Sequence, residues 1–142
     1  SKSPTIIGKV ISKSLTKKMV NNSVKSVFGP FTKPSNNFLE KQWEILNYNQ
    51  GKDIAYLIGR LVFEKYNFLN RWVNAMQNTT IPMCYICGPF DPNSGRHMAN
   101  RYKELIPNSK VYMLDKYIGH WPQLEDKENM IRYYQEFIIS LK

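Results

Sequence analysis

The residues that could perform chemistry in this chain of 142 amino acids are an aspartate and a histidine. Asp91 follows the short apolar segment Met83–Cys87, and His120 follows a second one, Lys110–Leu114. If both segments are strands of one parallel sheet, their carboxyl ends lie at the edge where catalytic groups collect in α/β folds. An acid and a histidine in this order are the partners that a nucleophilic hydrolase needs after its nucleophile.

Each of the two residues has a functional and a structural interpretation. His120 could be a general base, because an imidazole with an ordinary pKa of about 6.5 both accepts and donates protons near neutrality. Asp91 would then orient the imidazole and stabilise its protonated form. Alternatively, Asp91 is a turn residue ahead of Pro92 that caps the next helix, and His120 is a solvated loop residue. The preceding strands and Gly119 favour the catalytic interpretation.

A nucleophile is not apparent in the sequence. Neither G-x-S-x-G nor G-x-D-x-G, the pattern of a nucleophile on a sharp strand-to-helix turn, occurs in the 142 residues. We therefore expect the nucleophile, Ser or Asp, to lie on polypeptide upstream, and the chain to be the C-terminal part of an enzyme.

The other reactive side chains give weaker signals. His97 is expected on the exposed start of a helix, and two distant histidines do not make a metal site, so no metal ligand is assigned. Cys84 and Cys87 form a C-x-x-C pattern, but residues three apart on a strand face opposite sides. A redox pair requires a helix N-terminus, so we interpret them as two buried thiols. No cofactor is implied.

The positive charge of the chain is concentrated in its first half. The formal net charge is +9, with twelve Lys or Arg and four Asp or Glu in residues 1–78, and eight and seven in residues 79–142. This division indicates two segments with different surroundings. No zinc-ligand spacing or nucleic-acid-binding motif accompanies the charge, so nucleic acid is not an expected partner.

Residues 1–78 have the periodicity of helices. An apolar row of four-residue spacing starts the chain, Ser35 is placed to cap a second helix that ends near Leu46, and Asp53 a third that ends near Met76. The apolar row consists of Ile7, Ile11, Leu15 and Met19, and the opposing row of Lys9, Lys13 and Lys17. Such a basic amphipathic segment could lie on an anionic membrane. The interpretation that we prefer is a helix packed on the protein body with its lysines in water.

Residues 79–142 alternate between strand and helix patterns. Helices are expected at Arg96–Ile106 and after a capping Asp126, with Met130, Ile131, Tyr134, Phe137 and Ile138 facing inward. The order strand–helix–strand–helix predicts two parallel strands of an α/β fold. Two parallel strands do not form a stable sheet alone, so the sequence predicts a sheet that is incomplete without upstream residues.

Several of these motifs resemble the C-terminal portion of α/β-hydrolase fold enzymes. They are Ile81–Pro82, then Gly88–Pro92, then Gly119–Asp126. The helical part is similar to the cap of one group in this family, the mesoderm-specific transcript proteins, at Val27–Ser35, Trp43–Ile45 and Phe68–Val73.

The resemblance implies a helical cap at residues 1–78 and, at residues 79–142, the last βαβα part of the hydrolase core. Asp91 and His120 match the family's acid and histidine. It further implies hydrolysis of an ester- or lipid-like substrate without a cofactor, at the endoplasmic reticulum membrane. Trp43, Trp72 and Trp121 would line an apolar substrate pocket.

A second hypothesis is that the chain is a non-catalytic interaction or membrane-surface module that kept the hydrolase fold. The basic amphipathic segment and the missing nucleophile support it. The sequence does not give an oligomeric state.

Overall fold

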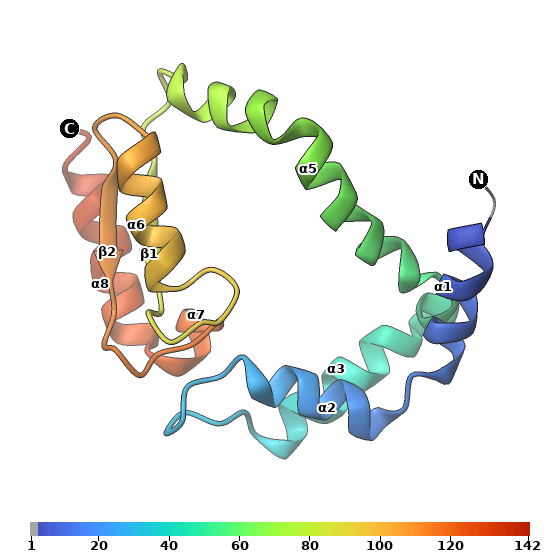
Figure 1. The fold of residues 1–142 in the computed structure, drawn as a ribbon. Coiled ribbons are helices and arrows are strands. Elements are labelled where there is room, and N and C mark those ends of the chain that lie inside the picture. The colour runs from blue at the N-terminus through green and yellow to red at the C-terminus, as the bar shows by residue number, and fades with distance from the viewer. Residues whose placement is uncertain (1–2) are drawn as a thin grey trace. The chain divides into compact units, whose positions relative to one another are not determined.

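The chain forms two compact units in the computed structural model (Figure 1). The model describes residues 3–142, without the side chains of residues 3–7 and 60, so the predicted role of Ile7 lies outside the described residues. Unit 1 consists of Ser1–Val24 and Pro34–Asn70, and unit 2 of Lys25–Lys33 and Arg71–Lys142. The predicted division into a cap at residues 1–78 and a core part at residues 79–142 stays a prediction.

The first half of the chain is helical, as the sequence predicts. Its elements are α1 (Ser3–Ser14), α2 (Lys17–Ser26), α3 (Asn36–Asn47), the 3₁₀-helix η1 (Tyr48–Gln50), α4 (Gly51–Ile54) and α5 (Tyr56–Gln77). The segment between α2 and α3, which contains Gly29–Pro30 and Lys33–Pro34, is irregular.

The basic row does not lie on one helix, which corrects the prediction of a continuous amphipathic segment. The helix ends at Ser14 and a new one begins at Lys17, so Lys9 and Lys13 lie on α1 and Lys17 on α2. Lys17 is moreover paired with Glu40 of α3 at 2.6 Å. The uninterrupted four-residue spacing concealed this break, because the linking residues Leu15 and Thr16 continue the pattern.

The capping residues of this half were predicted with mixed success. Ser35 caps α3 as expected, and its Oγ accepts a hydrogen bond from the Phe38 amide at 3.1 Å. Asp53 does not start a helix, because α4 already begins at Gly51 after two residues with positive φ, Asn49 and Gln50. The helix therefore starts two residues before Asp53.

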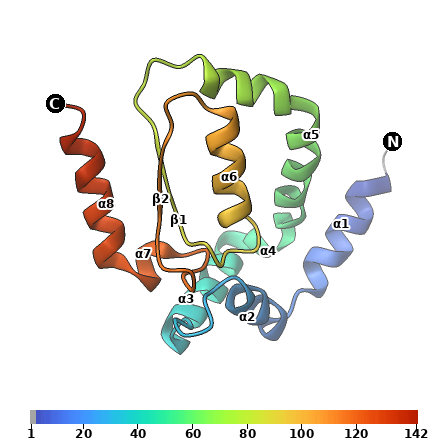
Figure 2. The same ribbon diagram turned by 60° about the vertical axis from the view of Figure 1, so that its left-hand side comes forward.

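Unit 2 contains the two strands, and they are parallel as predicted. Its elements are β1 (Cys84–Cys87), α6 (Arg96–Leu105), β2 (Lys110–Met113), α7 (Pro122–Glu125) and α8 (Lys127–Ile139). Cys84 is opposite Lys110, and Cys87 is opposite Met113. Helices α6 and α8 cover opposite faces of the strand pair (Figure 2).

Most of the fully buried apolar side chains belong to unit 2. Within the described residues they are Phe28, Cys87, Ala99, Ile106, Leu114, Ile118 and Phe137, whereas unit 1 contributes Leu39. The inward face of α8 differs from the predicted one, since Ile131, Tyr134 and Ile138 are exposed. The helix is rotated so that Tyr133 stacks on Tyr112 of β2, with ring centroids 4.9 Å apart.

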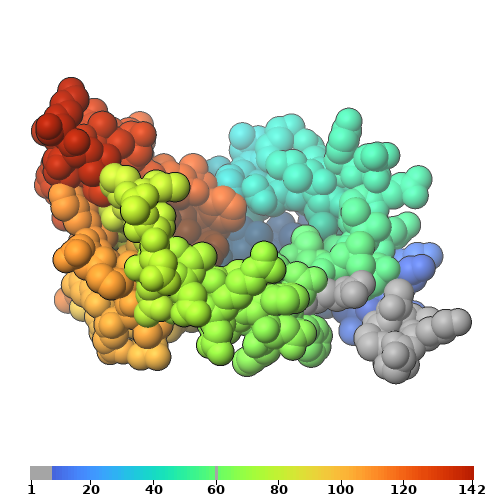
Figure 3. Space-filling view, turned by 90° about the horizontal axis from the view of Figure 1, so that it is seen from above, coloured from blue at the N-terminus to red at the C-terminus, as the bar shows by residue number. Residues whose placement is uncertain are grey.

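Helix α5 exposes large apolar side chains along most of its length. The exposed fractions are 73% for Ile58, 70% for Phe63 and 80% for Tyr66, and Leu57, Leu61 and Val62 are exposed beside them. Figure 3 shows the side chains of α5, in green to yellow-green, at the surface. Exposed large apolar side chains in this number are typical of a surface that binds a partner or a membrane.

Replacing Ser35 with Ala should lower the free energy of unfolding by about 1 kcal/mol, because α3 loses the acceptor for its Phe38 amide. Urea denaturation followed by circular dichroism measures the change. Ser35→Asp, which retains a side-chain acceptor, is the matched control. A loss of equal size in both variants would contradict the capping role.

Candidate active site

The structure brings Asp91 and His120 into direct contact. His120 Nδ1 lies 2.7 Å from Asp91 Oδ2, within hydrogen-bonding distance. Asp91 follows β1 and His120 follows β2, so the parallel pairing places the two loops at the same edge of the strand pair. The separation in sequence is 29 residues, and both residues belong to unit 2.

The two loops touch through their backbones. The Phe90 amide donates to the Ile118 carbonyl at 2.8 Å. A Cβ atom added to Gly88 would lie 2.1 Å from the Gly119 carbonyl oxygen, far inside van der Waals contact. Glycine is therefore required at position 88 by the close approach of the loops, and this approach sets the distance between Asp91 and His120.

The Asp91 carboxylate is buried and surrounded by donors. Its side chain is 4% exposed. Oδ1 accepts from the Asn93 amide at 2.8 Å, and Oδ2 accepts from the Ser94 hydroxyl as well as from His120. The carbonyl of Ser94 is in turn bonded to the Tyr85 hydroxyl, so the donor loop is itself held by β1.

These contacts decide the protonation of Asp91. Burial by itself raises the pKa of this carboxyl, but the hydrogen bonds from Ser94, Asn93 and His120 outweigh the burial and lower its pKa below the ordinary value of 3.8. An ionised Asp91 can only accept a hydrogen bond, so His120 Nδ1 must be the donor. The neutral imidazole therefore carries its hydrogen on Nδ1, and its lone pair on Nε2.

The His120 ring remains accessible although its partner is buried. Its side chain is 41% exposed, and the neighbouring Trp121 ring meets it edge-on at 5.9 Å. Trp121 also stacks on the buried ring of Phe28 at 6.2 Å. An oriented and partly exposed imidazole can remove a proton from a group that reaches its Nε2.

The residues that hold Asp91 and His120 in place were not predicted from the sequence. Asn93 and Ser94 form a turn with Asp91, and the pattern Asp–Pro–Asn–Ser is a signal for such a turn. Asp91 is thus a turn residue, as the structural interpretation predicts, but it does not cap α6, whose N-cap is Gly95. Its catalytic role stays a prediction. Glu125 was noticed only as part of a motif, yet its carboxylate contacts backbone amides on both sides of His120.

Of the three tryptophans predicted to line a pocket, the structure places Trp121 beside His120. Trp43 lies on α3 in unit 1, where Lys52 Nζ is 5.7 Å from its ring centroid. Trp72 lies on the part of α5 that belongs to unit 2 and is 38% exposed. A substrate-lining role for all three stays a prediction.

The remaining reactive groups lie outside this pair. His97 is exposed on α6 and contacts the Asn93 carbonyl at 3.2 Å. Cys84 and Cys87 are free thiols, and burial raises the pKa of both. In the described part of the chain, no group of three or more His, Cys, Asp or Glu is placed to hold a metal ion.

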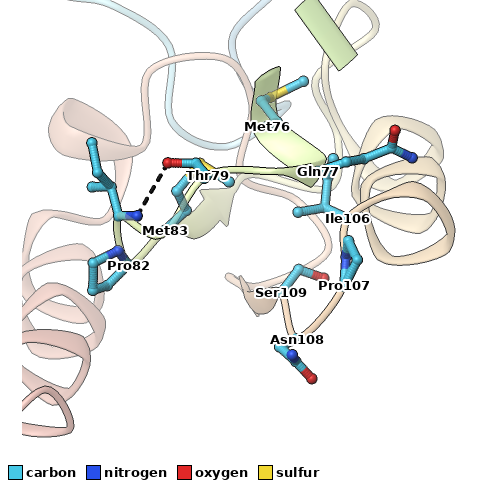
Figure 4. A pocket seen from close by; sticks show the side chains of 10 residues that line it. Met76, Gln77, Thr79, Pro82, Met83, Ile106, Pro107, Asn108 and Ser109 are labelled. Atoms are coloured by element: carbon cyan, nitrogen blue, oxygen red, sulfur yellow. Dashed lines mark hydrogen bonds between the residues drawn. The ribbon is translucent and has the colours of Figure 1, made fainter. Parts of the chain in front are cut away.

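A cavity of about 220 Å³ lies at the opposite edge of the strands (Figure 4). Its lining residues precede β1 and β2, whereas Asp91 and His120 follow them. They are Met76, Gln77, Thr79, Ile81, Pro82, Met83, Ile106, Pro107, Asn108 and Ser109. The cavity is therefore not part of the candidate active site.

No helix within residues 3–142 combines the length and the apolar character needed to cross a bilayer.

Comparison with known proteins shows what the chain is similar to. No family model matches the chain. It is 35% identical to the human and 33% identical to the mouse mesoderm-specific transcript protein over 138 residues, which is 94% of the chain. It is 31% identical over 99 residues to the putative hydrolase LipZ of Mycobacterium tuberculosis. A solved serine hydrolase involved in carbazole degradation, the CarC enzyme, matches 89% of the chain at a TM-score of 0.66 and 16% identity.

The chain is a relative of the mesoderm-specific transcript proteins and has part of an α/β-hydrolase fold. The predicted fold class, part of an α/β-hydrolase fold with parallel strands, is thereby confirmed. The chain spans 41% of the length of the mesoderm-specific transcript relatives, 34% of LipZ and 48% of the serine hydrolase. The resemblance to the mesoderm-specific transcript proteins is confirmed as well.

The depressed pKa of Asp91 makes stability depend on pH in the acid range. Ionised Asp91 favours the folded state above the ordinary pKa of 3.8, and this contribution is lost as the pH falls through the lower folded-state pKa. The melting temperature of Asp91→Asn should therefore approach that of the wild type as the pH is lowered from 6 to about 2. A difference that stays constant over this range would contradict the hydrogen-bonded carboxylate.

Proposed function

We propose that this chain supplies the acid and the histidine of a nucleophile–histidine–acid triad that hydrolyses an ester- or lipid-like substrate. Asp91 is the acid and His120 the base. The nucleophile, Ser or Asp, is contributed by polypeptide outside these 142 residues. No cofactor takes part in the proposed reaction.

The observation that supports this proposal is the 2.7 Å contact between a buried, multiply hydrogen-bonded carboxylate and an accessible imidazole. A surface ion pair would have two exposed partners and would contribute little. Here only the imidazole reaches solvent, as a base that must meet a substrate requires. The hydrolase names of LipZ and of the matching serine hydrolase point to the same reaction class.

The proposed roles follow from the geometry of the pair. With a serine nucleophile, His120 Nε2 takes the hydroxyl proton as the oxygen attacks the ester carbonyl, and then returns it to the leaving alkoxide. An aspartate nucleophile attacks without giving up a proton. In both cases Nε2 then removes a proton from the water that cleaves the covalent intermediate, which releases the acid or alcohol and the free nucleophile. In either case Asp91 holds the hydrogen on Nδ1 and stabilises the imidazolium that forms.

A second candidate function is attachment to a membrane surface, such as that of the endoplasmic reticulum. The exposed apolar side chains of α5 favour it, because burial of such side chains at a lipid interface removes apolar area from water. The first half of the chain also has an excess of eight positive charges, which would favour anionic lipids.

Replacing His120 with Ala should lower kcat for ester hydrolysis by about a thousandfold or more in a protein that joins this chain to its nucleophile, because the base is lost. The matched control is His97→Ala, which removes an exposed histidine from α6 and should leave kcat unchanged. Steady-state kinetics on a chromogenic ester measure both variants. Equal activities in the two variants would exclude the proposed role of His120.

The 142-residue chain alone should hydrolyse no ester above the buffer rate, since no nucleophile pattern occurs in it. Clear turnover that His120→Ala abolishes would place the nucleophile inside the chain.

Sedimentation with vesicles tests the second candidate function, attachment to a membrane. Binding to anionic but not to neutral vesicles, reduced by Ile58→Gln with Phe63→Gln, would support attachment to a membrane.

A further inference from the structure

The most densely bonded side chain near His120 is the carboxylate of Glu125. Its Oε2 accepts from the Gly29 amide at 2.8 Å, the Thr32 hydroxyl at 2.6 Å and the Gly119 amide at 2.9 Å. Its Oε1 accepts from the Trp121 amide at 3.0 Å. We call this set of five residues the Glu125 clamp.

The clamp fixes the backbone on both sides of the proposed base. The amides of Gly119 and Trp121 point to Glu125, and the His120 amide between them donates to the Val27 carbonyl at 2.9 Å. The amides of three successive residues, 119 to 121, therefore donate hydrogen bonds to residues outside this loop. These hydrogen bonds leave the backbone at His120 little freedom to rotate. They therefore fix the position of the Cα–Cβ bond from which the imidazole extends.

The segment opposite His120 comes from a distant part of the sequence. Gly29 and Thr32 are more than 90 residues from Glu125, and they lie in Lys25–Lys33, which belongs to unit 2 while both of its flanks belong to unit 1. A Cβ atom on Gly119 would lie 2.3 Å from the Val27 carbonyl oxygen, so the two backbones are in direct contact. The segment Lys25–Lys33 thus packs directly against the loop that carries His120.

The chemistry of the clamp specifies an ionised carboxylate. All four groups that face Glu125 are donors: three amides and one hydroxyl. An ionised carboxylate is an acceptor only, with room for about four such bonds. A glutamine would direct its NH₂ group at one or more of these donors and leave them without an acceptor, which is costly for part-buried groups.

We propose that Glu125 is a positioning residue for His120, and that it acts by holding residues 119–121 against residues 27–32. The catalytic consequence rests on the function proposed above, but the clamp itself does not. Without the clamp, the His120 loop separates from the segment 27–32, and the imidazole no longer holds a fixed orientation toward Asp91.

Hydrogen exchange tests the clamp independently of activity. In Glu125→Gln and Glu125→Ala, the amides in peptides covering residues 27–32 and 117–122 should exchange at least tenfold faster than in the wild type, as measured by mass spectrometry. The Leu114 amide, which donates to the Cys87 carbonyl at 3.0 Å, reports on the strand pair and should keep its protection. Uniform loss of protection across unit 2 would overturn the proposal and make Glu125 a general stabilising residue.

Two further variants serve as a mild perturbation and as a control. Thr32→Val preserves shape but removes one of the four donors, and it should increase exchange in peptide 27–32 about twofold to fivefold without unfolding the unit. Glu104→Gln removes an exposed ion pair with Arg101 on α6 and should change neither peptide. Wild-type exchange in the Thr32→Val and Glu125→Ala variants would also overturn the proposal.

The activity readout separates this inference from the proposed function. In a protein that includes the nucleophile, Glu125→Gln should lower kcat at least tenfold with KM within twofold of the wild type. If exchange increases in the clamp peptides while His120→Ala is fully active, the clamp stands and the proposed function fails. If His120→Ala is inactive while exchange in the Glu125 variants is unchanged, the function stands and the clamp fails.

Discussion

The candidate active site depends on the contact of three backbone segments without side chains between them. Gly88, Gly119 and Gly29 lie where the loops after β1 and β2 and the segment Lys25–Lys33 approach one another, and any Cβ atom there would overlap a backbone oxygen. Because the carbonyl and amide groups meet directly, backbone hydrogen bonds bring the loops of Asp91 and His120 together. The Glu125 carboxylate adds hydrogen bonds to the amides on both sides of His120. Such precision is what proton transfer over a hydrogen bond requires.

Two carboxylates in this small region have different tasks because their surroundings differ. Asp91 faces an imidazole together with a hydroxyl and an amide, so it can respond to a charge that forms on His120. Glu125 faces only groups that keep their protons, so it has a constant role in holding the backbone. Hydrogen bonds to charged acceptors are stronger than neutral ones, which offsets the cost of burying the Asp91 carboxylate and of partly burying that of Glu125.

The sequence predicts the local features of the fold well and the long-range ones less well. The parallel strands, the caps at Ser35 and Asp126, and the order of acid and histidine follow from periodicity and from residues adjacent in the chain. The break after Ser14, the buried face of α8 and the start of α4 at Gly51 rather than after Asp53 were not predicted, because packing against neighbouring elements and the backbone conformation at Asn49 and Gln50 decide them. The Glu125 clamp joins residues more than 90 positions apart, and no local pattern reveals such a contact.

The membership of Lys25–Lys33 in unit 2 affects how the chain can be divided. A polypeptide that starts at residue 79 would contain Asp91, His120 and Glu125, yet it would lack Val27, Gly29 and Thr32. Water would then have to replace the carbonyl partner of the His120 amide and two donors of Glu125. Asp91 and His120 are only 29 residues apart, but the backbone that supports them includes the distant segment Lys25–Lys33. The smallest unit able to keep this geometry therefore includes residues that lie far ahead of the strands.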